Sequence, residues 1–313
     1  MTVQRDYPKH MPWVSGGPFQ ASTRKWLSPT TQILSIGSCF AVNFGRWLNN
    51  RGGAVLPHSW GLHFNPLAIY EEFMRTNSAT DERPIWTRLV ARRIEYYDPL
   101  RYTLRAGTEI ELIQRNREID LEFSRNIGIA DAFLITLGLA EIWEEQLHSG
   151  RWVPLNVTPP VGIYDCERHR VRLLSIREIA SALRTLVSLI RSKRSLPIPI
   201  VFTVSPVPLK ATFSADDVRV ANSRSKAALL MAVHELLADL NDDFLSYFPA
   251  YEIFHDIGNK QQVWQEDLRH PTALGIELVC GQFLNIYSAE PSQFKAQGSF
   301  DVKRVSRFSH RPE

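Results

Sequence analysis

Apolar positions along this chain fall into short continuous runs, which alternate with longer segments in which apolar residues recur at helical spacing. The clearest run is Ala132 to Leu137, which is uninterrupted, as expected of a central strand buried on both faces of a parallel sheet. Five runs are predicted to be strands: 32–36, 54–56, 132–137, 197–204 and 245–254. The other periodic segments are predicted to be helices: 40–51, 66–74, 117–127, 175–190, 223–240 and a last helix after Pro271.

Strand and helix therefore alternate about five times along the chain. This order predicts an α/β fold, a three-layer α/β/α sandwich around a mainly parallel five-stranded sheet. Local signals support the helix ends. Ser175 followed by Glu178 has the spacing of a capping box, and Gly52-Gly53 closes the first helix.

Three segments depart from this alternation. Residues 77–116 combine β-branched and aromatic residues with charged ones and contain turn signals at Asp98-Pro99 and Ala106-Gly107, which predicts an inserted β-rich excursion. Residues 1–30 are rich in Pro and Gly and are expected to be irregular, as is the Pro-rich stretch 150–174. Residues 291–313 form a basic tail. The expected organisation is thus one domain over 31–290 with an irregular leader, an insertion and a tail.

Composition and charge argue against several functional classes but do not identify the activity. The 313 residues are 44% hydrophobic and 22% charged, with a formal net charge of only +3, so nothing points to nucleic acid. The three cysteines are far apart and form neither a disulfide framework nor zinc-ligand spacing. A secretory h-region and a run of about 18 apolar residues are both absent. We expect a cytoplasmic protein with no metal, no cofactor and no stable membrane insertion.

Ser38 is the first candidate for chemistry. It stands between the predicted strand 32–36 and the helix that follows, at the position where helical N–H groups lack partners. A serine there is commonly an N-cap, and it is also well placed to be a nucleophile beside oxyanion donors. Its neighbour Cys39 is expected to point into the interface between helix and sheet, since buried cysteines are usually inert.

Other polar residues follow the ends of other predicted strands. In parallel sheets these carboxyl ends form one rim, where ligands bind. The rim is expected to bring together Ser38, Gly61, Gly138 and the pair Asp267 and His270. Asp267 lies three residues before His270, close enough to orient the imidazole, and the order Ser, Asp, His suits a catalytic triad.

The residues at this rim resemble the GSCFA family, a branch that looks related to the SGNH/GDSL hydrolases. The resemblance starts from Gly37-Ser38-Cys39-Phe40-Ala41 and spans about 36 to 275, most of the chain. The further matching blocks are Asn65-Pro66, Thr136-Leu137-Gly138 with Glu141 and Trp143, Thr203 to Val207, Asn222-Ser223 with Ser225-Lys226, Tyr247-Phe248-Pro249 with Tyr251-Glu252, and His270-Pro271.

The resemblance implies a flavodoxin-like SGNH hydrolase fold with Ser38 as nucleophile, His270 as base and Asp267 as its partner. It also implies an oxyanion hole built from the serine N–H, a glycine N–H, for which Gly61 is the candidate, and an Asn side chain. The chain departs from the pattern here, because Ala140 stands where that Asn would be. The side chain of Asn65 or the backbone of Gly138 is the candidate replacement.

Substrate contacts are expected from residues beside these blocks. Glu141 and Trp143 follow the third strand, and His63 flanks Gly61. The leading hypothesis is a serine-dependent hydrolase or O-acyltransferase acting on acyl esters, in particular acetyl esters, of a carbohydrate-like substrate. The alternative is a non-catalytic glycan-binding module on the same fold, motivated by the missing Asn. A phosphate-binding α/β protein ranks last, because the glycine-rich phosphate-loop pattern is absent.

Overall fold

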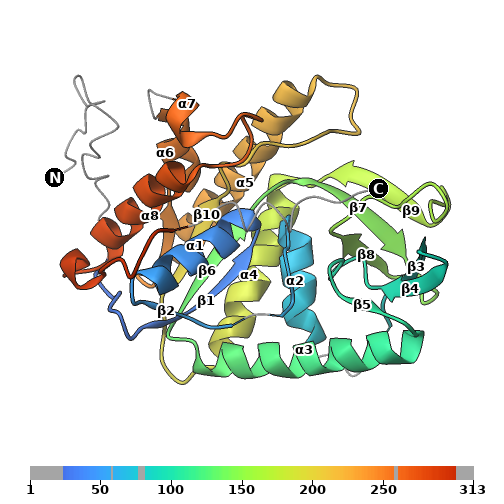
Figure 1. The fold of residues 1–313 in the computed structure, drawn as a ribbon, viewed down its shortest axis with the longest axis horizontal. Coiled ribbons are helices and arrows are strands. Elements are labelled where there is room, and N and C mark those ends of the chain that lie inside the picture. The colour runs from blue at the N-terminus through green and yellow to red at the C-terminus, as the bar shows by residue number, and fades with distance from the viewer. Residues whose placement is uncertain (1–23, 58, 77–81, 257–259, 301–313) are drawn as a thin grey trace.

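Five parallel strands form the central sheet of the computed structural model, which describes residues 24–57, 59–76, 82–256 and 260–300 (Figure 1). Their order in the sheet is β11-β10-β6-β1-β2. In chain order this is 2-1-3-4-5, the flavodoxin-like arrangement, so the predicted fold class is confirmed. The strands are β1 (Gln32–Gly37), β2 (Ala54–Val55), β6 (Ala132–Leu137), β10 (Ile200–Val204) and β11 (Leu245–Phe248).

Helices cover both faces of this sheet (Figure 1). One face packs against α1 (Cys39–Asn50), α6 (Ala250–Asp256), α7 (Lys260–Val263) and α8 (Ala273–Tyr287). The other face packs against α2 (Pro66–Arg75), α3 (Glu109–Ile129), α4 (Ile176–Ser192) and α5 (Val218–Leu240). A short 3₁₀ turn, Pro291–Gln293, follows α8.

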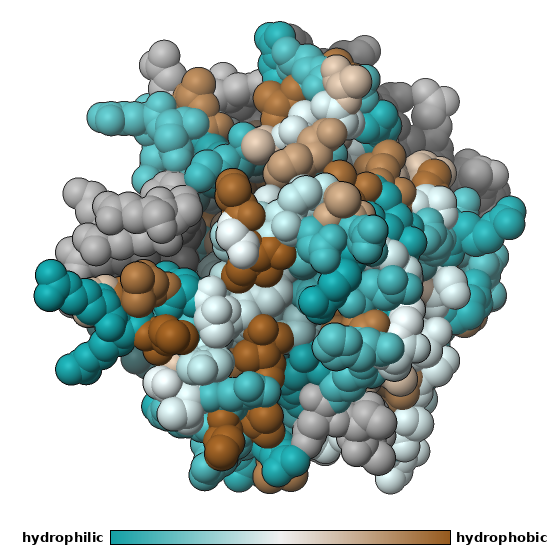
Figure 2. Space-filling model, turned by 90° about the vertical axis from the view of Figure 1, so that its right-hand side faces the viewer, coloured by the Kyte–Doolittle hydropathy of each residue, from teal (hydrophilic) through white to brown (hydrophobic). Residues whose placement is uncertain are grey.

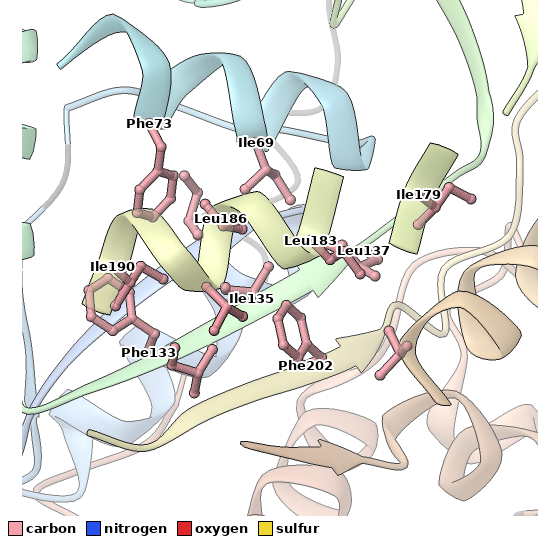
Figure 3. Packing of buried hydrophobic residues seen from close by; sticks show 14 of the residues in the cluster. Ile69, Phe73, Phe133, Ile135, Leu137, Ile179, Leu183, Leu186, Ile190 and Phe202 are labelled. Carbon is pink, nitrogen blue, oxygen red and sulfur yellow. The ribbon is translucent and has the colours of Figure 1, made fainter. Parts of the chain in front are cut away.

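The second of these faces carries the larger core. Figure 3 shows the side chains of β6 and β10 facing α2 and α4, with aromatic and branched residues interlocked between the layers. Continuous apolar strands need this two-sided cover, which explains why the strand signal was so clear in the sequence. The labelled residues are Ile69, Phe73, Phe133, Ile135, Leu137, Ile179, Leu183, Leu186, Ile190 and Phe202.

Two small antiparallel sheets extend from the sandwich on the side of its carboxyl rim. The first, in the order β3-β4-β5, is the predicted β-rich insertion, but it ends at Ala106. Residues 109–116 lie instead in α3, because Thr108 caps that helix by accepting a hydrogen bond from Glu111 N and two acidic residues fill its first turn. The strands are β3 (Trp86–Val90), β4 (Arg93–Tyr97) and β5 (Arg105–Ala106).

The second small sheet has two of its three strands in the stretch 150–174, which the sequence predicted to be irregular. Its order is β8-β7-β9, with β7 (Glu141–Gln146) in the centre, β8 (Trp152–Leu155) and β9 (His169–Leu173). Pro154 pairs with Glu144 in this sheet and is tolerated because β8 is an edge strand. Figure 2 views the molecule from the side of these small sheets, where separate hydrophobic patches lie between hydrophilic side chains.

A buried ion-pair network joins the first small sheet to the sandwich. Arg101, 1% exposed, binds both carboxylate oxygens of Glu72 on α2 and the carboxylate of Asp120 on α3. Arg75 pairs with Asp98 at 2.5 Å in the same layer. These contacts hold the insertion in place beside the rim.

Among the described residues, none of the helices combines the length and the apolar character needed to cross a membrane.

Candidate active site

Ser38 lies at the turn between β1 and α1, as the sequence predicted. Gly37 before it has φ +133°, and a Cβ there would lie 2.1 Å from Thr136 O, so only glycine allows β1 and β6 to end this close together. Ser38 is the N-cap of α1, and its Oγ accepts a hydrogen bond from Phe40 N at 3.3 Å. A hydroxyl that accepts keeps its own proton to donate, so capping and nucleophilic chemistry are compatible at Ser38.

His270 and Asp267 form a hydrogen-bonded pair in the loop before α8. Oδ2 of Asp267 contacts Nδ1 of His270, while Oδ1 accepts the N–H groups of Arg269 and His270, each at 3.0 Å. Burial opposes ionisation of Asp267, but the hydrogen bonds from His270 and Arg269 outweigh it and lower its pKa to about 2. Asp267 is therefore an ionised carboxylate at neutral pH, able to orient and stabilise an imidazolium.

A cavity of about 450 Å³ opens at the carboxyl ends of β1, β6 and β10. This is the size of a small-molecule site. Five of the residues predicted to act in the site line it, and Arg269, the immediate neighbour of His270, lines it as well. The predicted lining residues are Ser38, Asn65, Gly138, Glu141 and Trp143.

Gly61, His63, Asp267 and His270 lie outside the set of residues that lines the cavity, although Arg269 between the last two belongs to it. Gly61 has φ +80°, and a Cβ there would lie 3.0 Å from Thr103 Oγ1. His63 is fully buried, donates its backbone N–H to Gly37 O at 2.8 Å, and pairs through Nε2 with Glu72 at 2.9 Å. His63 thus belongs to the buried ion-pair network that supports the rim.

The two candidate replacements for the missing oxyanion Asn already have partners. The N–H of Gly138 donates to Phe64 O at 2.9 Å, and a Cβ on Gly138 would lie 2.6 Å from that oxygen. Asn65 caps α2 by accepting from Ala68 N at 2.8 Å, and its Nδ2 donates to Leu155 O at 3.3 Å. Both residues therefore shape the cavity wall by linking separate segments of the chain.

An aromatic wall forms one side of the cavity. Trp143 packs edge-on against Phe213, with ring centroids 4.9 Å apart, and against Tyr164 at 6.0 Å. Glu141 fixes the loop that carries Phe213, because it accepts hydrogen bonds from Thr212 Oγ1 at 2.6 Å and from Phe213 N at 2.9 Å. The loop after β10 is thereby tied across the cavity to β7.

Cys39 lines the cavity next to Ser38, and so is not confined to the interface between helix and sheet as the sequence suggested. Burial raises the pKa of its thiol, although Arg269 and Lys226 oppose this shift. A protonated thiol is a poor nucleophile, so Ser38 remains the better candidate at this junction.

Lys226 supports the cavity from behind and was not singled out as a site residue from the sequence. Its buried Nζ donates to three carbonyl oxygens, those of Gly138 at 2.7 Å, Ser205 at 2.7 Å and Val207 at 2.9 Å. All three acceptors lie in residues that line the cavity. The available signal was a lysine three residues before Leu229, on the apolar face of its helix.

Comparison with known proteins gives one family and several solved structures, among them an esterase. The model of the GSCFA family matches residues 32–283. Among solved structures, an acetyl xylan esterase (Est2A) from the rumen bacterium Butyrivibrio proteoclasticus aligns with a TM-score of 0.29 and 11% sequence identity, over 74% of this chain and 56% of that chain. The chain thus spans little more than half the length of that esterase. No curated protein matches.

Proposed function

Because the chain belongs to the GSCFA family and carries a serine in a cavity bordered by the Asp267–His270 loop, we propose that it is a serine-dependent acyl hydrolase or O-acyltransferase. The observation that carries the proposal is the Asp267–His270 pair, in which an ionised carboxylate holds the imidazole beside a cavity-lining arginine. Such a pair is the base and its orienting acid in serine acyl transfer.

In the proposed reaction, Ser38 Oγ attacks the acyl carbon and His270 takes the hydroxyl proton. Asp267 stabilises the resulting imidazolium, and the oxyanion is held by N–H groups at the N-terminus of α1. His270 then returns the proton to the leaving alcohol, which departs and leaves an acyl group on Ser38. Water, or the hydroxyl of an acceptor, releases that acyl group by the same steps in reverse.

The substrate class that we propose is an acyl ester, in particular an acetyl ester, of a carbohydrate-like molecule. The aromatic wall of Trp143 and Phe213 supports this, since aromatic faces pack well against the apolar faces of sugar rings. The cavity volume of about 450 Å³ accommodates a sugar-sized ligand.

Intact-mass spectrometry after exposure to a fluorophosphonate probe tests the chemistry. We expect one adduct on the native protein, no adduct on Ser38→Ala, and labelling slowed roughly 10²-fold or more on His270→Ala, the usual contribution of a general base. Ser188→Ala, which changes an exposed serine on α4, is the matched control and should label normally. An adduct that persists on Ser38→Ala would refute the proposal.

A second candidate function is a non-catalytic glycan-binding module. Ala140 in place of the family-type Asn, and the occupied donors of Gly138 and Asn65, favour it. A folded protein that binds sugars yet forms no fluorophosphonate adduct would support this candidate.

Turnover that accelerates when an acceptor alcohol is added, with slow hydrolysis without it, would identify a transferase rather than a hydrolase.

A further inference from the structure

We propose that the cavity selects a substrate carrying an anionic substituent, a carboxylate or a phosphate, and that Arg269 binds this group. The inference rests on the proposed function for the location of the ester, and it adds the charge class of the molecule that carries the ester. Four features of the cavity support it: the unpaired state of Arg269, the loop that holds it, the balance of charge, and an unused donor on the aromatic wall.

Arg269 has a backbone carbonyl and the ring of His270 as its partners. Its Nε donates to Pro208 O at 3.2 Å, and its Nη1 lies 3.5 Å from Nε2 of His270. It forms no ion pair with any residue that the structure describes, whereas Arg75 and Arg101 bind carboxylates. A guanidinium has five N–H donors in a planar fork that matches carboxylate and phosphate oxygens, so Arg269 brings unused donors into the cavity.

The loop around Arg269 fixes its position. Leu268 adopts φ +49°, a left-handed conformation that is unfavourable for a leucine. The conformation is held on both sides, because Asp267 accepts the N–H groups of Arg269 and His270, and Gln265 N donates to His270 O at 2.8 Å. Strain of this kind persists only where the surroundings enforce it, and here it places the guanidinium and the imidazole side by side.

The charges around the cavity are predominantly positive. Arg269 and Lys210 line it, and Lys226 lies behind its wall with carbonyl partners alone among the described residues. Lys226 adds only part of a charge at neutral pH, because burial lowers its pKa to about 7. Glu141 is the acidic residue of the described lining, and its carboxylate is engaged by Thr212 and Phe213. The N-terminus of α1 adds a partial positive charge beside Ser38. An anionic ligand is therefore favoured electrostatically.

Catalysis gives a further reason for an anion at Arg269. In the proposed reaction His270 becomes an imidazolium, and a guanidinium 3.5 Å away would repel it. A carboxylate or phosphate bound to Arg269 neutralises that repulsion. A neutral substrate leaves it in place, so the anionic substituent is expected to improve the chemical step as well as binding.

The aromatic wall offers the sugar ring of such a substrate both a surface and a donor. Trp143 Nε1 is buried and has no hydrogen-bond partner within the described part of the chain. An indole N–H in this state is expected to find an acceptor when the cavity fills, and the hydroxyl or acyl oxygens of a sugar ester supply one. Trp143 and Arg269 would then hold the two ends of one ligand.

Three probes that differ only at C6 test the proposal: the methyl 2,3,4-tri-O-acetyl derivatives of glucuronate, glucose 6-phosphate and glucose. Calorimetric binding to the Ser38→Ala protein avoids turnover during the measurement. We expect the anionic probes to bind roughly 10- to 100-fold more tightly than the neutral one, the range of a charge-assisted hydrogen bond. The tighter of the two anionic probes identifies the substituent as carboxylate or phosphate.

Arg269→Gln should abolish this preference by weakening binding of the anionic probes far more than binding of the neutral probe, while Arg269→Lys should retain part of it. Arg219→Gln is the matched control, because it makes the same change of charge at an exposed arginine paired with Asp217. Equal binding of the three probes, binding of none of them, or a preference that survives Arg269→Gln would overturn the proposal.

Acetate release by the native enzyme separates this inference from the proposed function. Turnover without preference for the anionic probes would overturn the anion site and leave the serine chemistry standing. Preferential binding that depends on Arg269, with no turnover and no fluorophosphonate adduct, would support the anion site and argue against serine catalysis.

Discussion

Replacing Lys226 by methionine removes a buried amino group from behind the cavity wall while keeping an unbranched side chain as far as Cε. Nζ of Lys226 donates to Gly138 O, Ser205 O and Val207 O. Only the charged form has three N–H donors, so the neutral amine leaves one carbonyl without a partner. Burial nevertheless opposes the charge and lowers the pKa of Lys226 from 10.5 to about 7.

The sign of the pH effect follows from the proton balance. Between about pH 7 and pH 10.5 the unfolded chain binds more protons at Lys226 than the folded protein, so the free energy of unfolding rises with pH. Integrating from pH 7 to about pH 9 gives an increase of about 2 kcal/mol from this group. Below pH 7 both states are protonated, and the destabilisation caused by Lys226 stays at its full value.

Urea unfolding of the native protein and of Lys226→Met at pH 7, 8 and 9 measures this contribution, since subtraction cancels the groups that the two proteins share. The charged and titratable groups facing Lys226, Arg269 and Cys39, are present in both proteins. We expect the difference in unfolding free energy to move by about 2 kcal/mol in favour of the native protein over this range. Lys210→Met, at an exposed lysine, should give a difference that does not vary with pH. A difference in unfolding free energy that does not change with pH for Lys226→Met would refute the reasoning. It would mean that the three carbonyl oxygens stabilise the buried ammonium as well as water does.

Two further changes test the framework around the site. Arg101→Met leaves the fully buried Glu72 without its main partner and should lower the free energy of unfolding, measured in urea, by about 3–5 kcal/mol. The double variant Arg101→Met/Glu72→Gln should recover part of this loss. No loss in the single variant would contradict a paired network. Ser175→Ala removes the observed capping box with Glu178 and should cost about 1 kcal/mol in thermal unfolding, whereas Ser188→Ala on the same helix should cost less.

The sequence alone determined where the five strands and most of the helices of the sandwich lie. The last strand was predicted too long, because it ends at Phe248 and residues 250–256 form α6. Strands buried on both faces must be apolar throughout, and helix caps act on N–H groups two or three positions away, so both leave local signals. The positions of Ser38 at the start of α1 and of Asp267 beside His270 could be read in the same way, since each depends on neighbours within one turn.

Tertiary structure decided the second small sheet and the roles of the charged residues. β8 forms a hairpin with β7 through a short turn that contains Gly150 at φ +85°, so this pairing is local. β9 pairs with the other edge of β7, although β8 lies between them in the chain, so its pairing leaves no short-range signal. The sequence placed His63 among the expected substrate contacts, yet its side chain pairs with Glu72 in the buried network. The roles of Lys226 and Arg269 depend on their surroundings in the fold. Lys226 donates to carbonyl oxygens that follow two different strands. Arg269 donates to a carbonyl oxygen and has no acidic partner among the described residues. The physical reason is that periodicity and capping act over a few residues, whereas the partner of a charge is set by segments that meet only in the folded chain.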